Sequence, residues 1–146
     1  MNRKEFIKKC SLACAGGSFS TLLLQRCESV KMVTAPMVGS DLIVALSEFE
    51  FLKKDRLQFR NYVVLVNDRL QYPVCVYRIS STTYTALWMR CTHQGTELQA
   101  FGDKLHCPAH GSEFNKKGGV ENGPAANALR TFPVVVTDGQ LKISLK

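Results

Sequence analysis

Short apolar runs rich in Val, Ile, Tyr and Thr alternate with turn-forming residues from Asp41 to the end of the chain. Residues of these types favour strands, and runs of this length bounded by Gly, Asn and Asp are typical of β structure. The pattern therefore predicts strands in the following segments: Asp41–Leu46, Tyr62–Val66, Tyr72–Ile79, Thr83–Arg90, Leu98–Phe101, Lys104–Cys107, Thr131–Val136 and Gln140–Leu145.

Three turn sequences join neighbouring strands of this set: Asn67-Asp68-Arg69, Gly102-Asp103 and Asp138-Gly139. A tight hairpin needs positive φ, so the Asp138-Gly139 pair is the strongest of them. Strands this short and closely spaced predict an all-β fold, a small antiparallel sandwich or barrel-like domain. Glu48–Arg60 has an ambiguous period with room for a helical turn. His110–Arg130 lacks strand character and is rich in Gly, and long irregular loops of that kind are often functional.

The first thirty residues have a different pattern. Met1–Lys9 is polar and basic, and Cys10–Leu24 is an uncharged run. A membrane-spanning helix needs roughly 20 apolar residues, so this shorter run better fits the hydrophobic region of a signal peptide. We predict that residues 1–31 form an export signal or membrane-anchor helix with a linker, and that residues 41–146 form the folded domain. A short uncleaved helix packed on the domain is the alternative.

Two motifs in this segment resemble export signals. Arg3–Lys8 resembles a twin-arginine signal with Lys4 in place of the second arginine, and that route carries folded proteins. Leu22–Cys27 resembles a lipoprotein cleavage box with Arg26 in place of the usual small residue, which implies acylation of Cys27. The resemblances imply export to the periplasmic side and association with the membrane. A cytoplasmic location is the alternative.

The net charge of +7 is concentrated at the N-terminus. Residues 1–31 contain six basic and two acidic side chains, and the remaining residues have no basic run longer than a pair. This distribution argues against nucleic-acid binding. The remaining mildly basic surface is interpreted as an ordinary solvated surface, with docking to an acidic redox partner as the alternative. Apolar residues at 45% and charged residues at 21% are ordinary for a globular chain, and about 110 residues suffice for one domain that folds alone.

Two of the six cysteines stand in motifs that also contain histidine. Cys91-Thr92-His93-Gln94-Gly95 and Cys107-Pro108-Ala109-His110-Gly111-Ser112 each follow a predicted strand. The residues between them suffice for a hairpin, so two strand ends could present both motifs at one tip of the domain. Zinc fingers usually pair cysteine with cysteine and histidine with histidine. A C-x-H and a C-x-x-H motif instead fit a Rieske cluster, in which two histidines replace two cysteines on one iron.

Both motifs resemble the C-T-H-x-G and C-P-x-H-G-S sequences of the Rieske family, and the resemblance extends over Leu42–Lys146. It includes Gly123-Pro124-Ala125, which resembles the proline loop that covers the cluster. The resemblance implies a Rieske-type β domain with two cluster-binding loops at one tip and one 2Fe–2S cluster per chain. It further implies that Cys91 and Cys107 bind the inner iron. The second iron, closer to solvent, would be bound by His93 and His110.

Histidine ligation has electrostatic consequences. The charges of two ferric ions, two sulfides and two thiolates sum to zero, so the oxidised core is neutral. With four thiolates instead of two, the core would carry a negative charge. An electron enters a neutral core more easily, so the potential rises to roughly −150 to +300 mV. The free ring nitrogens can bind protons more tightly after reduction, which couples electron uptake to pH.

Further residues around the motifs refine the expected subtype. The resemblance implies that Ser112 donates to a bridging sulfide, whereas Phe114 replaces a tyrosine that donates to a ligand sulfur in high-potential members. Such hydrogen bonds raise the potential, so one donor kept and one lost predicts an intermediate value. The disulfide that links the two loops in cytochrome bc complexes would fall at Thr96 and Ala109, neither of which is cysteine. The turn glycines Gly95 and Gly111 let the backbone approach the sulfides, and Pro124 belongs to the covering loop.

The third histidine, His106, is predicted to be a non-ligand, and Cys75 a buried apolar residue. A mononuclear oxygenase iron needs two histidines and a carboxylate, so a self-contained oxygenase is excluded and the chain is expected to act as a redox carrier. Three interpretations remain open: an exported, membrane-anchored electron carrier with an oxidoreductase, cytochrome or quinol partner; a soluble ferredoxin component of an oxygenase system; and a module holding structural zinc.

Overall fold

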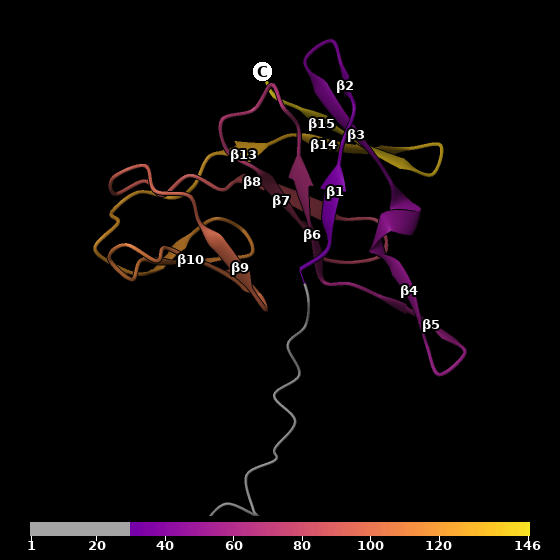
Figure 1. Cartoon of the computed structure of the whole chain (residues 1–146), viewed down its shortest axis with the longest axis horizontal. Helices are drawn as coiled ribbons and strands as arrows, with labels where there is room; N and C mark the ends of the chain where they lie inside the picture. The colour runs from indigo at the N-terminus through magenta and orange to yellow at the C-terminus, as the bar shows by residue number, and fades with distance from the viewer. Residues whose placement is uncertain (1–29) are drawn as a thin grey trace, which may run out of the picture.

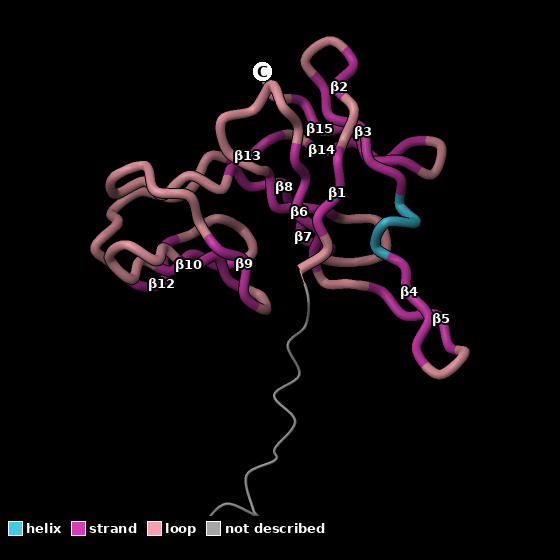
Figure 2. Tube along the Cα trace, in the orientation of Figure 1, coloured by secondary structure: helices cyan, strands magenta, loops and turns pink. Residues whose placement is uncertain are grey.

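The computed structural model describes residues 30–146, and the predictions of an export signal, an anchor helix and an acylated Cys27 concern residues outside this range. The described chain is built from short strands in three larger sheets and one separate hairpin (Figures 1 and 2). Every strand pair within it is antiparallel except one. The predicted all-β fold is confirmed. No helix within residues 30–146 is long and apolar enough to cross a bilayer.

A five-stranded sheet forms the centre of the domain. Its strands lie in the order β1 (Met32–Thr34), β6 (Tyr62–Val66), β7 (Val74–Arg78), β8 (Tyr84–Trp88) and β13 (Thr131–Phe132). The exception to antiparallel pairing is β1, which runs parallel to β6 with Met32 opposite Val64.

Both faces of the central sheet are covered, which explains why its middle strands are continuously apolar. Along β6, Val63 and Leu65 enter one buried cluster and Tyr62 and Val64 enter the other. The side chains of a strand point alternately to opposite faces, so a strand between two layers needs an apolar residue at every position. This arrangement makes the domain a sandwich with two cores.

The first core lies between the central sheet and the sheet β14-β15-β3-β2. Leu42, Val44, Leu141 and Ile143 fill it from the second sheet, and all four are almost fully buried. The strands of the second sheet are β2 (Met37–Val38), β3 (Asp41–Ala45), β14 (Val134–Thr137) and β15 (Gln140–Ser144). The predicted turn at Asp138-Gly139 joins β14 to β15, and both of its residues have positive φ.

The second core lies between the central sheet and a smaller sheet, β12-β11-β10-β9. Leu98, Leu105 and Phe114 fill it together with Cys91 and Cys107, so the two motif cysteines belong to a packed interior. The strands are β9 (Gln99–Phe101), β10 (Lys104–His106), β11 (Glu113–Asn115) and β12 (Val120–Asn122). They form a lobe on one side of the central sheet (Figure 1).

The structure resolves one open expectation and corrects two others. The ambiguous stretch 48–60 holds the end of a 3-10 turn, η1 (Leu46–Phe49), and then a hairpin of β4 (Glu50–Lys53) and β5 (Arg56–Phe59). His110–Arg130 was expected to lack strands but contains β11 and β12. Thr131–Val136 is not one strand, because Pro133 lacks the N–H of a ladder and the chain changes sheets there.

Candidate metal centre

The first motif forms a compact loop directly after the central strand β8. The Cys91 N–H donates to the Thr96 carbonyl at 2.8 Å, and the Gly95 N–H donates to the Cys91 carbonyl at 2.8 Å. Gly95 has φ 76°, a conformation that glycine adopts without the strain of a Cβ. The loop therefore returns on itself within five residues and orients its side chains from a fixed backbone.

The second motif repeats this backbone after β10. The Cys107 N–H donates to the Ser112 carbonyl at 2.8 Å, and the Gly111 N–H donates to the Cys107 carbonyl at 3.0 Å. Gly111 has φ 78°, within 2° of its counterpart in the first loop. Two loops with the same hydrogen-bond pattern thus present one cysteine and one histidine each.

The four motif side chains divide into an inner and an outer pair. Cys91 and Cys107 are each 1% exposed, and Cys107 lies within hydrogen-bonding reach of Cys91. His93 and His110 are exposed, and their rings meet edge to face with centroids 5.0 Å apart. The sequence prediction that both motifs lie together at one tip is fulfilled in this geometry.

The surroundings of Cys107 favour its thiolate. Burial disfavours the charged form, but the backbone N–H groups of Ala109 and His110 and the side chains of Cys91 and Thr96 outweigh it. The pKa of Cys107 is therefore lowered from its ordinary value. The thiolate is the form of cysteine that binds metal, so this loop fits an iron–sulfur group.

Ser112 is fully buried and connects the second loop to the segment that contains Pro124. Its Oγ accepts a hydrogen bond from the Ala125 N–H at 3.0 Å, which leaves the hydroxyl proton available to donate. Phe114, also fully buried, offers no such proton. The peptide bond Gly123–Pro124 is cis.

Two further side chains tie this covering segment to the loops, and sequence reasoning missed both. Thr92 Oγ1 donates to the Asn127 carbonyl at 2.6 Å, and Asn122 Nδ2 donates to the Gly111 carbonyl at 3.1 Å. Each acceptor is a backbone carbonyl, which any residue type supplies. No sequence pattern could therefore have identified these contacts.

Within residues 30–146, no group of three or more His, Cys, Asp or Glu side chains is arranged around a single metal position. In a Rieske cluster, each iron takes two ligands from the protein, and the two motifs together contain two cysteines and two histidines. His106 lies on β10 opposite Gln99 and Glu113, outside the pair formed by the other histidines. Cys75 is completely buried in β7, as expected.

Comparisons with known proteins agree with this geometry. Residues 48–133 match the model of the Rieske [2Fe-2S] domain family. Over 63 residues, the chain is 30% identical to the cytochrome b6-f complex iron-sulfur subunit of Chlorobaculum tepidum, a match to 42% of this chain and 35% of that subunit. A second such subunit, from Synechocystis, is 42% identical over 50 residues, which cover 33% of this chain and 28% of the relative. The matched region is thus about a third of these relatives' length.

A solved structure extends the comparison to the fold. The plasma membrane Rieske protein PetC3 of Synechocystis aligns with a TM-score of 0.51 and 29% identity, over 57% of this chain and 86% of that one. The family match covers more than half of the present sequence and includes both loops with their cysteines and histidines. The chain therefore belongs to the Rieske [2Fe-2S] domain family, whose members bind a Rieske-type 2Fe–2S cluster and transfer electrons.

Proposed function

We propose that Cys91, His93, Cys107 and His110 hold one cluster and that the chain is an exported electron carrier attached to the membrane through its N-terminal segment. The observation that carries the ligand assignment is the repeated loop, which buries two cysteines in mutual contact beneath two exposed imidazoles. When bound, the cluster supplies one-electron oxidation and reduction at a potential above that of an all-cysteine cluster.

The protein's own residues have distinct tasks in this proposal. The two buried cysteines hold the inner side of the site away from water. The two histidines reach the surface, where their ring edges offer a short path for an electron and a hydrogen-bonding group to a partner protein. Ser112 has a hydroxyl proton available to donate, and its Oγ accepts from the Ala125 N–H, which ties the covering segment to the second loop.

Export and membrane attachment rest on the sequence of residues 1–31, with its basic start, its uncharged run and Cys27. The partner is proposed to be an oxidoreductase, with a cytochrome or a quinol as the second redox species. The second candidate is a soluble ferredoxin that serves an oxygenase. The absence of cysteine at Thr96 and Ala109 favours that candidate, because it removes the loop-to-loop disulfide.

Electron paramagnetic resonance of the purified chain tests this proposal. The protein is reduced first with ascorbate and then with dithionite. A Rieske signal after ascorbate supports the higher-potential, exported carrier, and a signal only after dithionite favours the ferredoxin. Zinc in place of iron, with no signal, would refute both. Mass determination of the mature protein separately tests whether residues 1–26 are removed and whether Cys27 carries acyl chains.

A further inference from the structure

The hairpin β4–β5 projects from the domain and pairs only with itself among the described residues. Its two-residue turn, Lys54-Asp55, has φ 51° and 57°. The hairpin extends on the side opposite the lobe that carries the metal centre (Figure 1). Neither the proposed cluster nor the packing of the two cores requires this hairpin to project into solvent.

The cross-strand register makes the hairpin amphipathic. Leu52 lies opposite Leu57, and Phe59 belongs to the same face because paired residues share a face and alternate along the strand. These side chains are 74%, 55% and 45% exposed. The exposed cross-strand leucine pair therefore forms a small apolar surface near the tip of the hairpin. Nearer the base, the Arg78 guanidinium lies 4.4 Å from the centroid of the Phe59 ring, and Glu50 lies opposite Phe59.

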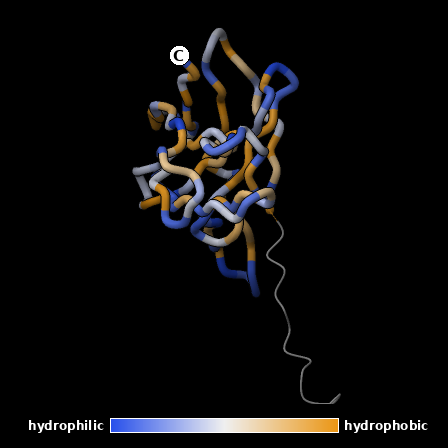
Figure 3. The backbone as a smooth tube through the Cα atoms, turned by 90° about the vertical axis from the view of Figure 1, so that its left-hand side faces the viewer, coloured by the Kyte–Doolittle hydropathy of each residue, from blue (hydrophilic) through white to orange (hydrophobic). Residues whose placement is uncertain are grey.

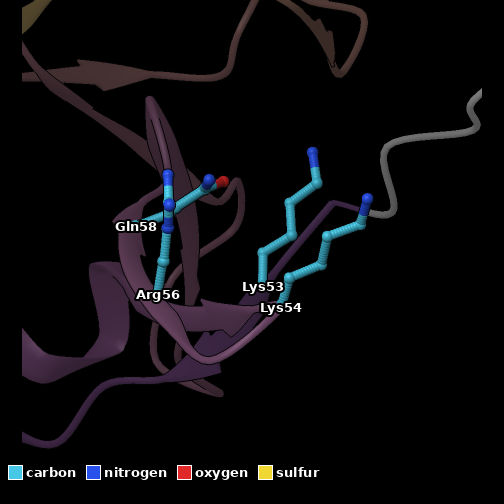
Figure 4. A pocket seen from close by; sticks show the side chains of 4 residues that line it. All are labelled: Lys53, Lys54, Arg56 and Gln58. Carbon is cyan, nitrogen blue, oxygen red and sulfur yellow. The ribbon is translucent and has the colours of Figure 1, made fainter.

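The opposite face is basic next to the turn, and nearer the base it holds Phe51 opposite Gln58. Lys53 lies opposite Arg56, and together with Lys54 and Gln58 these residues line an open hollow of about 560 Å³. Figure 4 shows the two lysines extending in the same direction from the turn. Among the described residues, none of the three cations forms an ion pair. The tip thus offers three cations against the single carboxylate of Asp55.

The chain enters the domain beside the base of this hairpin. Lys31 Nζ lies 3.3 Å from Glu48 Oε2, and Glu48 precedes the first strand of the hairpin by two residues. In Figure 1, the hairpin and the beginning of the described chain both lie in the lower part of the molecule. Figure 3 shows the molecule turned by 90° about the vertical axis, so this part is again at the bottom of the view. Twenty-nine residues precede Val30, among them the uncharged run Cys10–Leu24.

We propose that the hairpin docks on an anionic lipid bilayer, with Leu52 and Leu57 in the interfacial region and Lys53, Lys54 and Arg56 on lipid phosphates. An element with one apolar and one basic face matches the bilayer interface, where apolar side chains enter the acyl boundary and cations meet anionic headgroups. A stable protein interface buries roughly 800 Å² per partner over a broad surface, which suits this narrow finger less well. Docking at this end leaves the lobe with His93 and His110 clear of the bilayer.

The first experiment measures depth of insertion with the full-length, cluster-containing protein. Leu52→Trp is compared with Phe101→Trp, a substitution at a 79% exposed position on the hairpin β9–β10. The vesicles contain equal parts of phosphatidylcholine and phosphatidylglycerol, with or without bromine on the acyl chains. We expect a blue shift and bromine quenching for Leu52→Trp alone, after subtraction of the Trp88 signal. Vesicle-bound protein whose Leu52→Trp emission equals that in buffer would overturn the proposal.

The second experiment tests the charges. Lys53→Gln combined with Arg56→Gln is compared with Lys116→Gln combined with Lys117→Gln, the matched basic pair outside the hairpin. We expect the first variant to bind anionic vesicles about tenfold more weakly or worse, in a salt-sensitive manner, and the second to bind like the parent. Because the N-terminal segment is also proposed to hold the protein on the vesicle, the quantity compared is the salt-sensitive part of binding. An equal loss of that part in both variants, or no loss of it in the first, contradicts docking through the hairpin. The paramagnetic signal of the cluster stays unchanged in every variant, so this outcome is independent of the proposed redox function.

Discussion

His93 and His110 face each other edge to face, with ring centroids 5.0 Å apart and planes at 88°. The two loops have the same backbone hydrogen bonds, but the histidines occupy different positions in them. His93 is the second residue after Cys91, whereas His110 is the third residue after Cys107. Within each loop, the repeated backbone fixes the cysteine relative to the glycine, and the two rings meet although their positions in the loops differ. Both imidazoles therefore reach solvent at one tip.

Replacing one of these histidines should lower the reduction potential. His110→Cys adds a negative charge to the proposed cluster, which disfavours an added electron. We expect a decrease on the order of 100 mV or more, measured by redox titration followed by paramagnetic resonance. His106→Cys is the control, because that residue lies on β10 outside the histidine pair. An unchanged potential in His110→Cys, with the cluster still present, would contradict the ligand assignment.

Removal of the Ser112 hydroxyl should affect both potential and stability. A hydrogen bond to a charged acceptor contributes about 1.5 to 3 kcal/mol, so Ser112→Ala is expected to lower the potential by about 60 to 130 mV. The same change leaves the Ala125 N–H without its acceptor and costs about 1 to 3 kcal/mol of unfolding free energy. Thr92→Val is the control: it removes another side-chain link to the covering segment but no predicted sulfide donor. A similar loss of potential in Thr92→Val would show that closure of the segment, rather than the hydroxyl, sets the value.

Phe114→Tyr should change the potential in the opposite direction. Phe114 packs in the same buried cluster as both motif cysteines, so a hydroxyl added there can donate to a ligand sulfur. We expect a rise of about 60 to 130 mV, by the same conversion of one hydrogen bond into a potential. Phe132→Tyr, in the other core, adds a hydroxyl away from the site and should leave the potential unchanged. No rise in Phe114→Tyr would mean that the new hydroxyl does not reach a sulfur.

Substitutions of the three cysteines in the described part of the chain should differ in their effect on the cluster. Cys91→Ser and Cys107→Ser are expected to abolish the cluster. Cys75→Ala should retain it at about 1 kcal/mol lower stability, since the substitution only empties a small volume in the core. Burial also raises the pKa of the Cys75 thiol, so iodoacetamide should not label it in the folded protein. Iron content and labelling mapped by mass spectrometry check this, and loss of iron in Cys75→Ala would contradict it.

The ion pair between Asp41 and Lys142 should make part of the stability pH-dependent. The hydrogen bond from Lys142, at 3.0 Å, lowers the pKa of Asp41 below its ordinary 3.8. The folded protein then binds this proton more weakly than the unfolded chain, so the stabilisation is present above the ordinary value and is lost as pH falls through the folded value. Thermal unfolding of Asp41→Asn should show a small deficit at neutral pH that disappears in acid. Lys116→Gln, which removes a cation without a described pair, should show no such trend.

The motifs themselves were readable from the sequence because ligand chemistry is local. A thiolate and an imidazole two or three residues apart, followed by a glycine, specify a loop whatever surrounds it. Short runs of strand-favouring residues bounded by turn residues likewise predicted β6, β7 and β15. These features depend on neighbours along the chain.

The tertiary structure decided what depends on distant segments. Pro133 divides one apolar run between two sheets, and the hairpin β4–β5 turns through Lys54-Asp55, a pair without the glycine that marks such turns. The contact of Ser112 with Ala125 and the meeting of the two histidine rings join residues that are more than ten positions apart. The sequence thus determined which groups could bind a cluster. Only the packing of the small sheet β12-β11-β10-β9 on the central sheet determined that these groups meet, because a contact between remote segments depends on the whole core that holds them.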